Sequence, residues 1–287
     1  KIFQNIQETI LFKNSFNNSI IEIFSQINYA RFICFFINEQ EEIRKSETYL
    51  VPRGKYEDTF ISDSLSRYTE NSSGKLNGFS RRSLGVSKRL GGYDVDVIAE
   101  YEGSQEVEGL IKKVFPKFKG TQKIYEISNG DVYRELMIEA LETNKFKSSV
   151  TVHSAEDFSN MRLFVTEDGS TGITLTKQGF LGGAFGNPKA NRPNNLAQMM
   201  LLGIKEGAIT AEAFDTVLPD YYSMFGLKAV SRTAFNEEYR PLKENGALED
   251  WDYDTYYKFN EGKPDVVFFI YDGGSRETIQ ERIGQFD

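Results

Sequence analysis

Residues 209–233 constrain the fold of this chain more than any other stretch, because they predict three short elements in quick succession. Residues 209–214 form a mostly apolar run that is typical of a strand. Pro219 suits the first turn of a helix, where its missing N–H costs nothing, and Gly226 suits the left-handed cap that ends one. Residues 228–234 alternate as a strand does. The predicted unit is therefore strand, short helix, glycine, strand.

The tyrosine four residues before that glycine resembles a motif of a known superfamily. The segment Tyr221-Tyr222-Ser-Met-Phe-Gly226-Leu227 is similar to a motif in the C-terminal half of the GNAT N-acetyltransferases. Residues 150–272 resemble more closely a GNAT-like segment of phage and prophage proteins, and the likeness rests on residues 152–157, 214–219 and 264–272. It covers less than half of the chain. For the C-terminal half it implies a GNAT-like fold.

Composition and charge limit the classes of protein that this chain can belong to. Its 287 residues, 39% apolar and 26% charged, are typical of a soluble globular protein with one large or two ordinary domains. The net charge of -8 makes nucleic-acid binding an unfavoured function. No run approaches the roughly 18 uncharged apolar residues of a membrane helix. With one cysteine, Cys34, and one histidine, His153, we expect no disulfide and no metal site.

The N-terminal part of the chain predicts two segments. Residues 1–50 are rich in Asn, Ile and Phe at helical spacing, and we expect them to form a helical appendage. Residues 51–120 predict a polar linker and a small α/β segment. Within it, residues 64–89 favour a solvated linker with a local basic patch, or a contact with phosphate or an acidic partner. Residues 93–101 predict a strand, and residues 106–115 predict a helix that Pro116 ends.

From residue 121 to 287 the sequence predicts a GNAT-like domain. Strand patterns alternate with helix patterns, and a Ser154 cap with Asp157 three residues on predicts a short helix. This order builds a mixed sheet with helices on its faces, so we expect an α+β fold. The expected elements before residue 209 are strand 121–127, helix 129–144, strand 149–153, hairpin 161–176, strand 179–185 and helix 196–206.

The loop at residues 186–195 joins a predicted strand to a predicted helix, and the start of a helix favours an anion. In the GNAT superfamily this junction holds the pyrophosphate of acetyl-coenzyme A, so the resemblance implies a cofactor site here. The family's loop glycines are absent from this chain, and Pro188 and Pro193 each remove an N–H donor. An ordinary capped loop is the alternative. The candidate cofactor contacts are Gly186, Lys189, Asn191, Arg192, Asn194 and Asn195.

Three side chains are candidates for catalysis. Tyr222 matches the tyrosine with which many GNAT enzymes protonate the leaving thiolate, and a phenol of ordinary pKa suits that role. The predicted strand before the cofactor loop contains no acid. Glu212 and Asp215, on the following strand, are therefore the nearest candidates for the general base. A structural role is the alternative for each, and we expect one for His153 and for Cys34.

These patterns support two functions. The first is a cytoplasmic GNAT-like N-acyltransferase that moves an acetyl group from acetyl-coenzyme A to the amine of a small molecule or a protein. The second is a catalytically inactive GNAT-shaped phage virion or host-injected protein, with virion or self-assembly partners. The missing loop glycines and the missing strand acid favour the second function.

The family resemblance also implies a fork between two parallel strands. We expect Phe185 and Asp215 to lie at the ends of adjacent strands that separate, with Lys189 and Tyr222 on either side. Gly182 and Gly183 suit such a separation, because glycine permits a bulge or a close approach of the backbone.

Overall fold

A computed structural model describes residues 78–240, 248 and 250–271 of the chain. The chain divides into two units, residues 1–47 and residues 48–287, and the described residues belong to the second. The predicted helical appendage and Cys34 lie outside the described residues.

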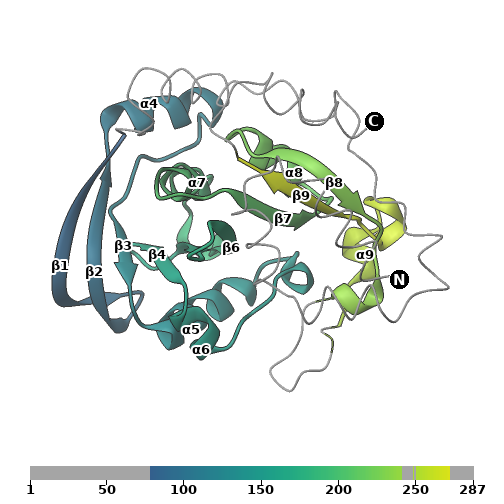
Figure 1. The fold of residues 1–287 in the computed structure, drawn as a ribbon, viewed down its shortest axis with the longest axis horizontal. Helices are drawn as coiled ribbons and strands as arrows, with labels where there is room; N and C mark the ends of the chain where they lie inside the picture. Colours follow the sequence, from purple (N-terminus) through teal and green to yellow (C-terminus); the bar gives the residue numbers. More distant parts are fainter. Residues whose placement is uncertain (1–77, 241–247, 249, 272–287) are drawn as a thin grey trace, which may run out of the picture. The chain divides into compact units, whose positions relative to one another are not determined.

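Within the described residues nine strands form one mixed sheet, which confirms the expected α+β fold (Figure 1). Their order across the sheet is β1-β2-β3-β4-β5-β6-β7-β9-β8. Every neighbouring pair is antiparallel except β6 and β7, which run parallel. The strands are β1 (Phe79–Leu90), β2 (Tyr93–Gly103), β3 (Ile124–Ile127), β4 (Arg162–Thr166), β5 (Thr171–Leu175), β6 (Phe180–Gly186), β7 (Thr210–Phe214), β8 (Lys228–Thr233) and β9 (Val266–Ile270).

Helices cover the two faces of the sheet and create two cores (Figure 1). On the α5 face, α5 (Gly130–Leu141) and α6 (Ala155–Ser159) pack against the middle strands. On the α7 face lie α4 (Gln105–Val114), α7 (Leu196–Lys205) and α8 (Leu218–Ser223). A last short helix, α9 (Tyr253–Tyr256), belongs to the long connection between β8 and β9. Single turns of 3-10 helix occur at Lys147–Ser149, Pro188–Ala190, Glu237–Tyr239 and Asn260–Gly262.

The strongest local signals of the sequence are confirmed. Pro219 lies in the first turn of α8, and Gly226 follows the helix with a φ of 82°, which only glycine adopts without strain. The hydroxyl of Ser154 accepts a hydrogen bond from the N–H of Asp157 and caps α6. Gly169 turns the β4–β5 hairpin with a φ of 72°. Local chemistry fixes these ends, so the sequence predicts them well.

The strand expected at residues 149–153 is wrong. This segment follows a 3-10 turn, Lys147–Ser149, and continues in a non-regular path to the cap of α6. Val150 and Val152 pack on the core of the α5 face, as their apolar character requires. The segment cannot join the sheet between β3 and β4, because these two strands already hydrogen-bond to each other.

Residues 79–90, expected to belong to a polar linker, form the longest strand of the sheet instead. β1 pairs with β2 through a tight turn at Gly91 and Gly92, both of which have a positive φ. Most of its side chains are exposed, because β1 is an outer strand. Its polarity therefore reflects its position at the sheet edge and not the absence of structure.

The sheet also continues across residue 120, where the sequence predicts a domain boundary. β2 pairs with β3 from Val97 to Tyr101. Phe79, Ala99 and Tyr101 share one core cluster with α7. Residues 78–120 therefore complete the core that the later strands begin.

We expect a fragment of residues 78–287 to unfold cooperatively in urea and a fragment of residues 121–287 to lose that cooperativity. The shorter fragment would expose the apolar surface of β3 and α7 that Tyr101 and Phe79 cover. Circular dichroism across a urea titration distinguishes the two. A cooperative transition of similar midpoint in the shorter fragment would restore the boundary at residue 121.

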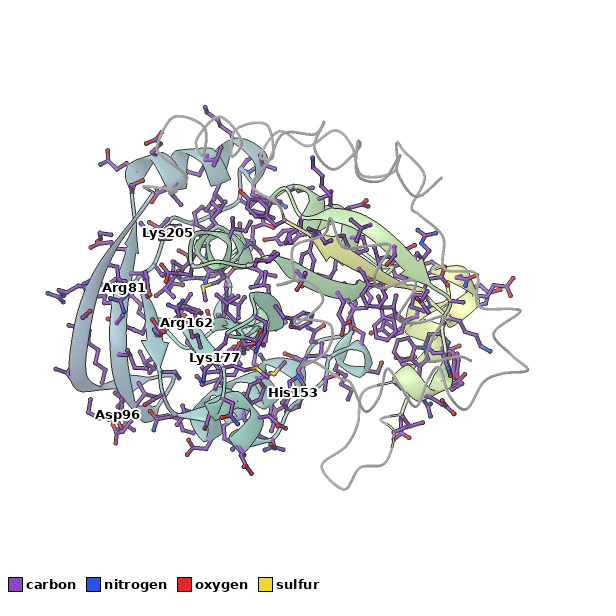
Figure 2. All side chains as sticks on the ribbon, in the orientation of Figure 1. Arg81, Asp96, His153, Arg162, Lys177 and Lys205 are labelled. Carbon is purple, nitrogen blue, oxygen red and sulfur yellow. The ribbon has the colours of Figure 1, made fainter. Side chains whose placement is uncertain are left out.

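A largely buried charge cluster around Arg162, which Figure 2 labels, connects β2, β3 and β4 with the end of α7. Arg162 donates two hydrogen bonds to Glu126, of 2.7 and 3.0 Å, and a third of 2.7 Å to Glu206. The hydroxyl of Tyr101 donates to Glu126 as well. Burial would raise the pKa of Glu126, but the hydrogen bonds and charge of Arg162 outweigh it, so this pKa lies below its usual value. Glu126 is therefore held as an anion within the core.

We expect Arg162→Met to destabilise the protein at pH 7, because it leaves the charge of Glu126 without its partner. Breaking a fully buried pair costs about 3–5 kcal/mol. Since 33% of the Arg162 side chain is exposed, we expect a loss of about 1–3 kcal/mol in the free energy of unfolding. A pKa lowered by folding stabilises the protein above the ordinary pKa of glutamate, and that contribution is lost as pH falls through the folded value. The difference between wild type and variant should therefore shrink below pH 4.5.

Arg82→Met is the matched control for this prediction. Arg82 contacts Glu100 at 3.0 Å, but 67% of its side chain is exposed. Its loss should change the free energy of unfolding by at most about 1 kcal/mol. Equal effects of the two substitutions in urea denaturation would contradict the structural role of the buried cluster.

Candidate active site

The parallel strands β6 and β7 part soon after they meet, as the sequence predicts. They pair only at Phe180 with Thr210 and at Leu181 with Ala211. Beyond these pairs β7 remains paired with β9 through Phe214, whereas β6 remains paired with β5 through Gly186. We call this divergence the fork and define it by residues 182–186 and 212–214. Along the fork the facing edges of β6 and β7 are not paired with each other.

Gly183 is the local cause of the fork. Its φ of 54° lies in the left-handed region, and a Cβ at this position would come within 2.7 Å of the Thr174 side chain. The register between β5 and β6 shifts here by one residue, which is the mark of a bulge in β6. The hydroxyl of Tyr133 donates a 2.8 Å hydrogen bond to the carbonyl of Gly183. The bend is thus fixed from α5 and accommodated by glycine.

Glu212 lies at the fork on the α5 face. Its neighbours Ala211 and Ala213 are buried in the α7-face core, and side chains alternate along a strand, so Glu212 points to the opposite face. The side chain is open to solvent, yet enough protein surrounds it for burial to raise its pKa. Within the described residues it forms neither a hydrogen bond nor an ion pair. A partly enclosed carboxyl group without a partner has the properties of a general base.

Tyr222 lies in α8 and is buried, with its ring edge-to-face against Phe269. Burial raises the pKa of its hydroxyl to about 12, and the negative charge of Glu212 contributes to that increase. Two of the three predicted catalytic residues are therefore within electrostatic reach of each other. The high pKa keeps the Tyr222 hydroxyl protonated at neutral pH and able to donate its proton.

Asp215, the third predicted catalytic residue, is held in an ion pair. Its carboxylate lies 2.5 Å from Nη2 of Arg232, and Nε of the same arginine lies 4.0 Å from the carboxylate of Asp265. The contact is an ion pair without good hydrogen-bond geometry at the guanidinium. The backbone N–H of Asp215 donates to the carbonyl of Asp265. Asp215 therefore fastens the end of β7 to β8 and β9, and Glu212 is the better placed base.

The loop before α7 holds the predicted cofactor contacts, and the side chains of Lys189, Arg192 and Asn195 already have partners. Asn191 and Asn194 take the left-handed conformation that lets the loop turn. Lys189 lies 3.5 Å from Glu142, and Arg192 lies 3.4 Å from Asp168. Both distances exceed the roughly 2.7–2.9 Å of a strong charge-assisted hydrogen bond. These cations are paired loosely, and Gly186 before them is exposed at the end of β6.

Asn195 does not cap α7, because its side chain is turned into a buried polar network. Its amide donates to Gln122 at 2.8 Å and to Thr171 at 3.1 Å, and its oxygen accepts from Gln198. Its role is therefore to anchor the loop. The first turn of α7 is left without a side-chain cap, which suits an anion.

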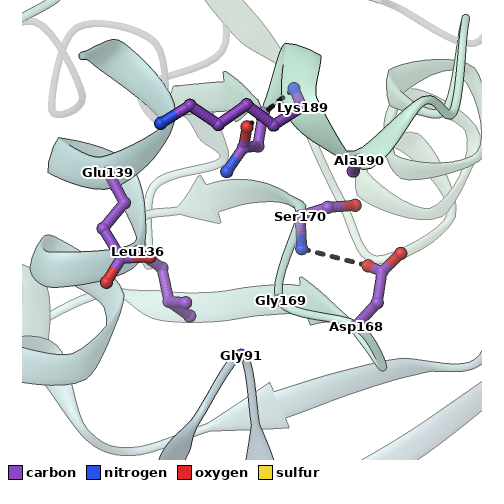
Figure 3. A pocket seen from close by; sticks show the side chains of 9 residues that line it. Gly91, Leu136, Glu139, Asp168, Gly169, Ser170, Lys189 and Ala190 are labelled. Atoms are coloured by element: carbon purple, nitrogen blue, oxygen red, sulfur yellow. Dashed lines mark hydrogen bonds between the residues drawn. The ribbon is translucent and has the colours of Figure 1, made fainter. Parts of the chain in front are cut away.

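A pocket of about 400 Å³ lies beside this loop (Figure 3). Its lining includes Lys189, Asn187, Glu139 and Asp168. Asp168 is already satisfied, since Thr166, Ser170 and Gln122 donate to it. The carboxylates of Glu139 and Asp168 in this pocket would both repel a diphosphate. The pocket therefore does not replace the start of α7 as the anion site.

Three features of the site were not predicted from the sequence. Arg232 pairs with Asp215 from a later strand, and no local pattern indicates that pairing. Thr210 carries a buried hydroxyl with no hydrogen-bond partner among the described residues. Trp251 stacks on Tyr256 and packs against Phe214 at the end of β7. The alternation of small and large residues in β7 was the one available signal for the orientation of Thr210 and Glu212.

Other candidate chemistries find little support within residues 78–240, 248 and 250–271. No group of three or more His, Cys, Asp or Glu side chains there could hold a metal ion. No helix in that part is long and apolar enough to cross a membrane. The ring of His153 packs edge-on against Phe158. Comparison of the chain with protein-family models, with curated proteins and with solved structures gave no match.

We expect Glu212→Gln to raise stability at pH 7. Folding raises the pKa of Glu212, so the native state favours its protonated form. Ionisation therefore costs stability once pH rises above the ordinary glutamate pKa, and the cost is complete above the folded value. Glutamine removes this cost, so urea denaturation should show a more stable variant at pH 7 and equal stability below pH of about 4.

Glu102→Gln is the control, because Glu102 is an exposed carboxylate on β2. It should leave the stability unchanged at both pH values. If the Glu212 variant were less stable than wild type at pH 7, its carboxylate would have a partner and could not be the open base described above.

Proposed function

We propose that this protein is a GNAT-like N-acetyltransferase, which transfers an acetyl group from acetyl-coenzyme A to an amine. The fork between β6 and β7 is the observation that carries the proposal. In the GNAT superfamily two parallel strands separate at the corresponding place, and the pantetheine arm of the cofactor lies between them. The strand order supports the same fold, since β9 lies between β7 and β8 and the preceding strands follow in sequence order.

The residues at the fork suit acetyl-coenzyme A in two respects. Beyond Leu181 the edge of β6 that faces β7 is not paired with β7, so its backbone groups could bind the amides of an extended ligand, apart from the Gly183 carbonyl that Tyr133 already satisfies. The uncapped start of α7, with Lys189 and Arg192 nearby, suits the diphosphate. Lys189 and Arg192 form weak ion pairs with Glu142 and Asp168, and a phosphate can replace these carboxylates as the partner of the two cations.

Two side chains would move protons in this reaction. Acetyl-coenzyme A, when bound, supplies an acetyl group activated as a thioester. A carboxylate oxygen of Glu212 accepts a proton from the amine nitrogen, and its raised pKa makes it a stronger base than an ordinary glutamate. The hydroxyl of Tyr222 donates a proton to the departing sulfur. The new C–N bond replaces the C–S bond, and the free thiol leaves.

A GNAT-shaped protein without catalysis is the second candidate. The loop at residues 187–195 has no glycine and two prolines, which reduces the number of N–H groups that it can offer to a diphosphate. Asn195 points away from the start of α7. In this alternative the fold serves as an interaction module, for example in a phage particle, and acetyl-coenzyme A does not bind.

Titration with acetyl-coenzyme A separates the two candidates. For the enzyme, ligand at 100 times its dissociation constant should raise the free energy of unfolding by about 2.7 kcal/mol. Thermal shift and calorimetry measure this stabilisation. A Lys189→Met, Arg192→Met double variant should bind more weakly, whereas Lys258→Met, a change of the same kind in the β8–β9 connection, should bind as wild type does. No stabilisation at millimolar ligand would favour the non-catalytic module.

Tyr222→Phe tests the proposed acid. Removal of a general acid lowers the rate by about 10²–10⁴-fold, and we expect a fall in kcat of that order with little change in the affinity for acetyl-coenzyme A. Release of thiol from acetyl-coenzyme A in the presence of an amine gives the rate. Tyr257→Phe, at an exposed tyrosine beyond α9, is the control. An unchanged kcat in the Tyr222 variant would remove Tyr222 from the chemistry.

A further inference from the structure

Large apolar side chains surround Glu212 on the α5 face. Phe268 of β9 lies directly opposite Glu212 in the antiparallel register, and Ile270 lies opposite Thr210. Directly opposed residues place their Cβ atoms about 4.5–5.5 Å apart on the same face. Phe214, two residues along β7, lies on that face too. The carboxylate therefore has aromatic neighbours across the ladder and along its own strand.

The apolar residues of β9 beside Glu212 are not completely buried by the described part of the chain. Phe268 and Ile270 are of intermediate exposure and belong to neither core cluster. Their strand neighbours Val267 and Phe269, which face α7 and α8, are fully buried. β9 thus has one face packed in the core and another that still presents apolar surface next to a carboxylate.

An aromatic wall closes one end of this surface. Phe214 packs against Trp251 with ring centroids 4.9 Å apart and against Phe235 at 6.3 Å. Trp251 is fixed in turn, because its indole N–H donates to the carbonyl of Gly262 and its ring stacks on Tyr256. The wall is rigid. It can bound a ligand that lies along β7 from Glu212 toward Phe214.

A lone carboxylate among aromatic rings suits one kind of ligand. Within the described residues Glu212 lacks any cationic partner, so a ligand's positive charge would provide the missing one. An ammonium group pairs with the carboxylate and is also attracted by the faces of aromatic rings. An apolar body attached to it would cover Phe268 and remove its surface from water.

We infer that the acceptor is a primary amine that carries an aromatic or bulky apolar group, bound on the α5 face with its ammonium at Glu212 and its body against Phe268 and the Phe214–Trp251 wall. The acetylation of the bound amine rests on the proposed function. The binding itself does not require acetyl-coenzyme A.

Binding of 2-phenylethylamine to the full chain tests this inference without acetyl-coenzyme A. Trp251 is the only tryptophan of the sequence, so its fluorescence reports directly on the wall. We expect saturable binding of 2-phenylethylamine in the fluorescence titration, confirmed by calorimetry. Ethylamine lacks the ring and N-acetyl-2-phenylethylamine lacks the charge, and we expect each to bind at least about tenfold more weakly, a difference of about 1.4 kcal/mol.

Variants assign the binding to the proposed residues. Glu212→Gln should weaken the binding of 2-phenylethylamine at least tenfold, and Glu102→Gln should leave it unchanged. Phe268→Leu should weaken 2-phenylethylamine more than ethylamine. Equal binding by wild type and the Glu212 variant, equal binding of ethylamine, or no binding at millimolar amine would each overturn the inference.

The outcome is independent of the test for acetyl-coenzyme A. Binding of the amine by a protein that ignores acetyl-coenzyme A would retain the amine site and remove the transferase. Binding of acetyl-coenzyme A by a protein that ignores the amine would retain the transferase and overturn this acceptor.

Discussion

The bulge at Gly183 is the constraint on which the site depends. A strand that stayed straight would pair with β7 along its whole length, and Glu212 would then lie beside a closed ladder. At Gly183 the left-handed backbone inserts one extra residue against β5 and turns β6 away from β7. The Tyr133 hydroxyl satisfies the carbonyl that this turn exposes. One glycine and one tyrosine thus convert an ordinary sheet into a sheet with an opening.

At the fork, the proposed proton donor and the proposed proton acceptor lie on opposite faces of the sheet. Tyr222 approaches from the α7 face, where it is buried against Phe269. Glu212 approaches from the α5 face, where solvent and apolar surface meet. A buried proton donor and a solvent-exposed proton acceptor need opposite surroundings. The separation of β6 and β7 allows the buried and the exposed surroundings to occur within one site.

The sequence predicted the elements whose ends depend on local chemistry. Pro219, Gly226 and the Ser154 cap fix their helices through bonds within a few residues, so their positions followed directly from the sequence. The segment 149–153 has the composition of a strand, but strand formation needs a free neighbour, and β3 and β4 already pair with each other. Residues 79–90 have the composition of a linker, but β2 gives them a partner. Pairing between distant segments is a tertiary property that a local pattern does not contain.

In the candidate site, too, some features depend on local sequence and others on contacts between distant segments. Alternation in β7 sets the direction of Glu212, and the helical spacing in α8 buries Tyr222, so both follow from the sequence. The state of Asp215 does not, because its partner Arg232 comes from a strand that pairs with β9 and not with β7. The partners of Lys189 and Arg192 likewise come from α5 and from the β4–β5 turn. A candidate site residue can be identified from one segment of the sequence, but its ion-pair partners come from other segments.

The outer strand β1 has a consequence for the behaviour of many copies in solution. Within the described residues it is the longest strand of the sheet and lies at one of its two edges, so its unpaired side could template the stacking of other chains. Its sequence places Arg81, Arg82, Lys88 and Arg89 along that strand, and a bulge between Ser83 and Val86 breaks its regular spacing. A second copy would bring the same cations against it. The cations and the bulge of this edge strand therefore oppose growth of such a stack into a fibril.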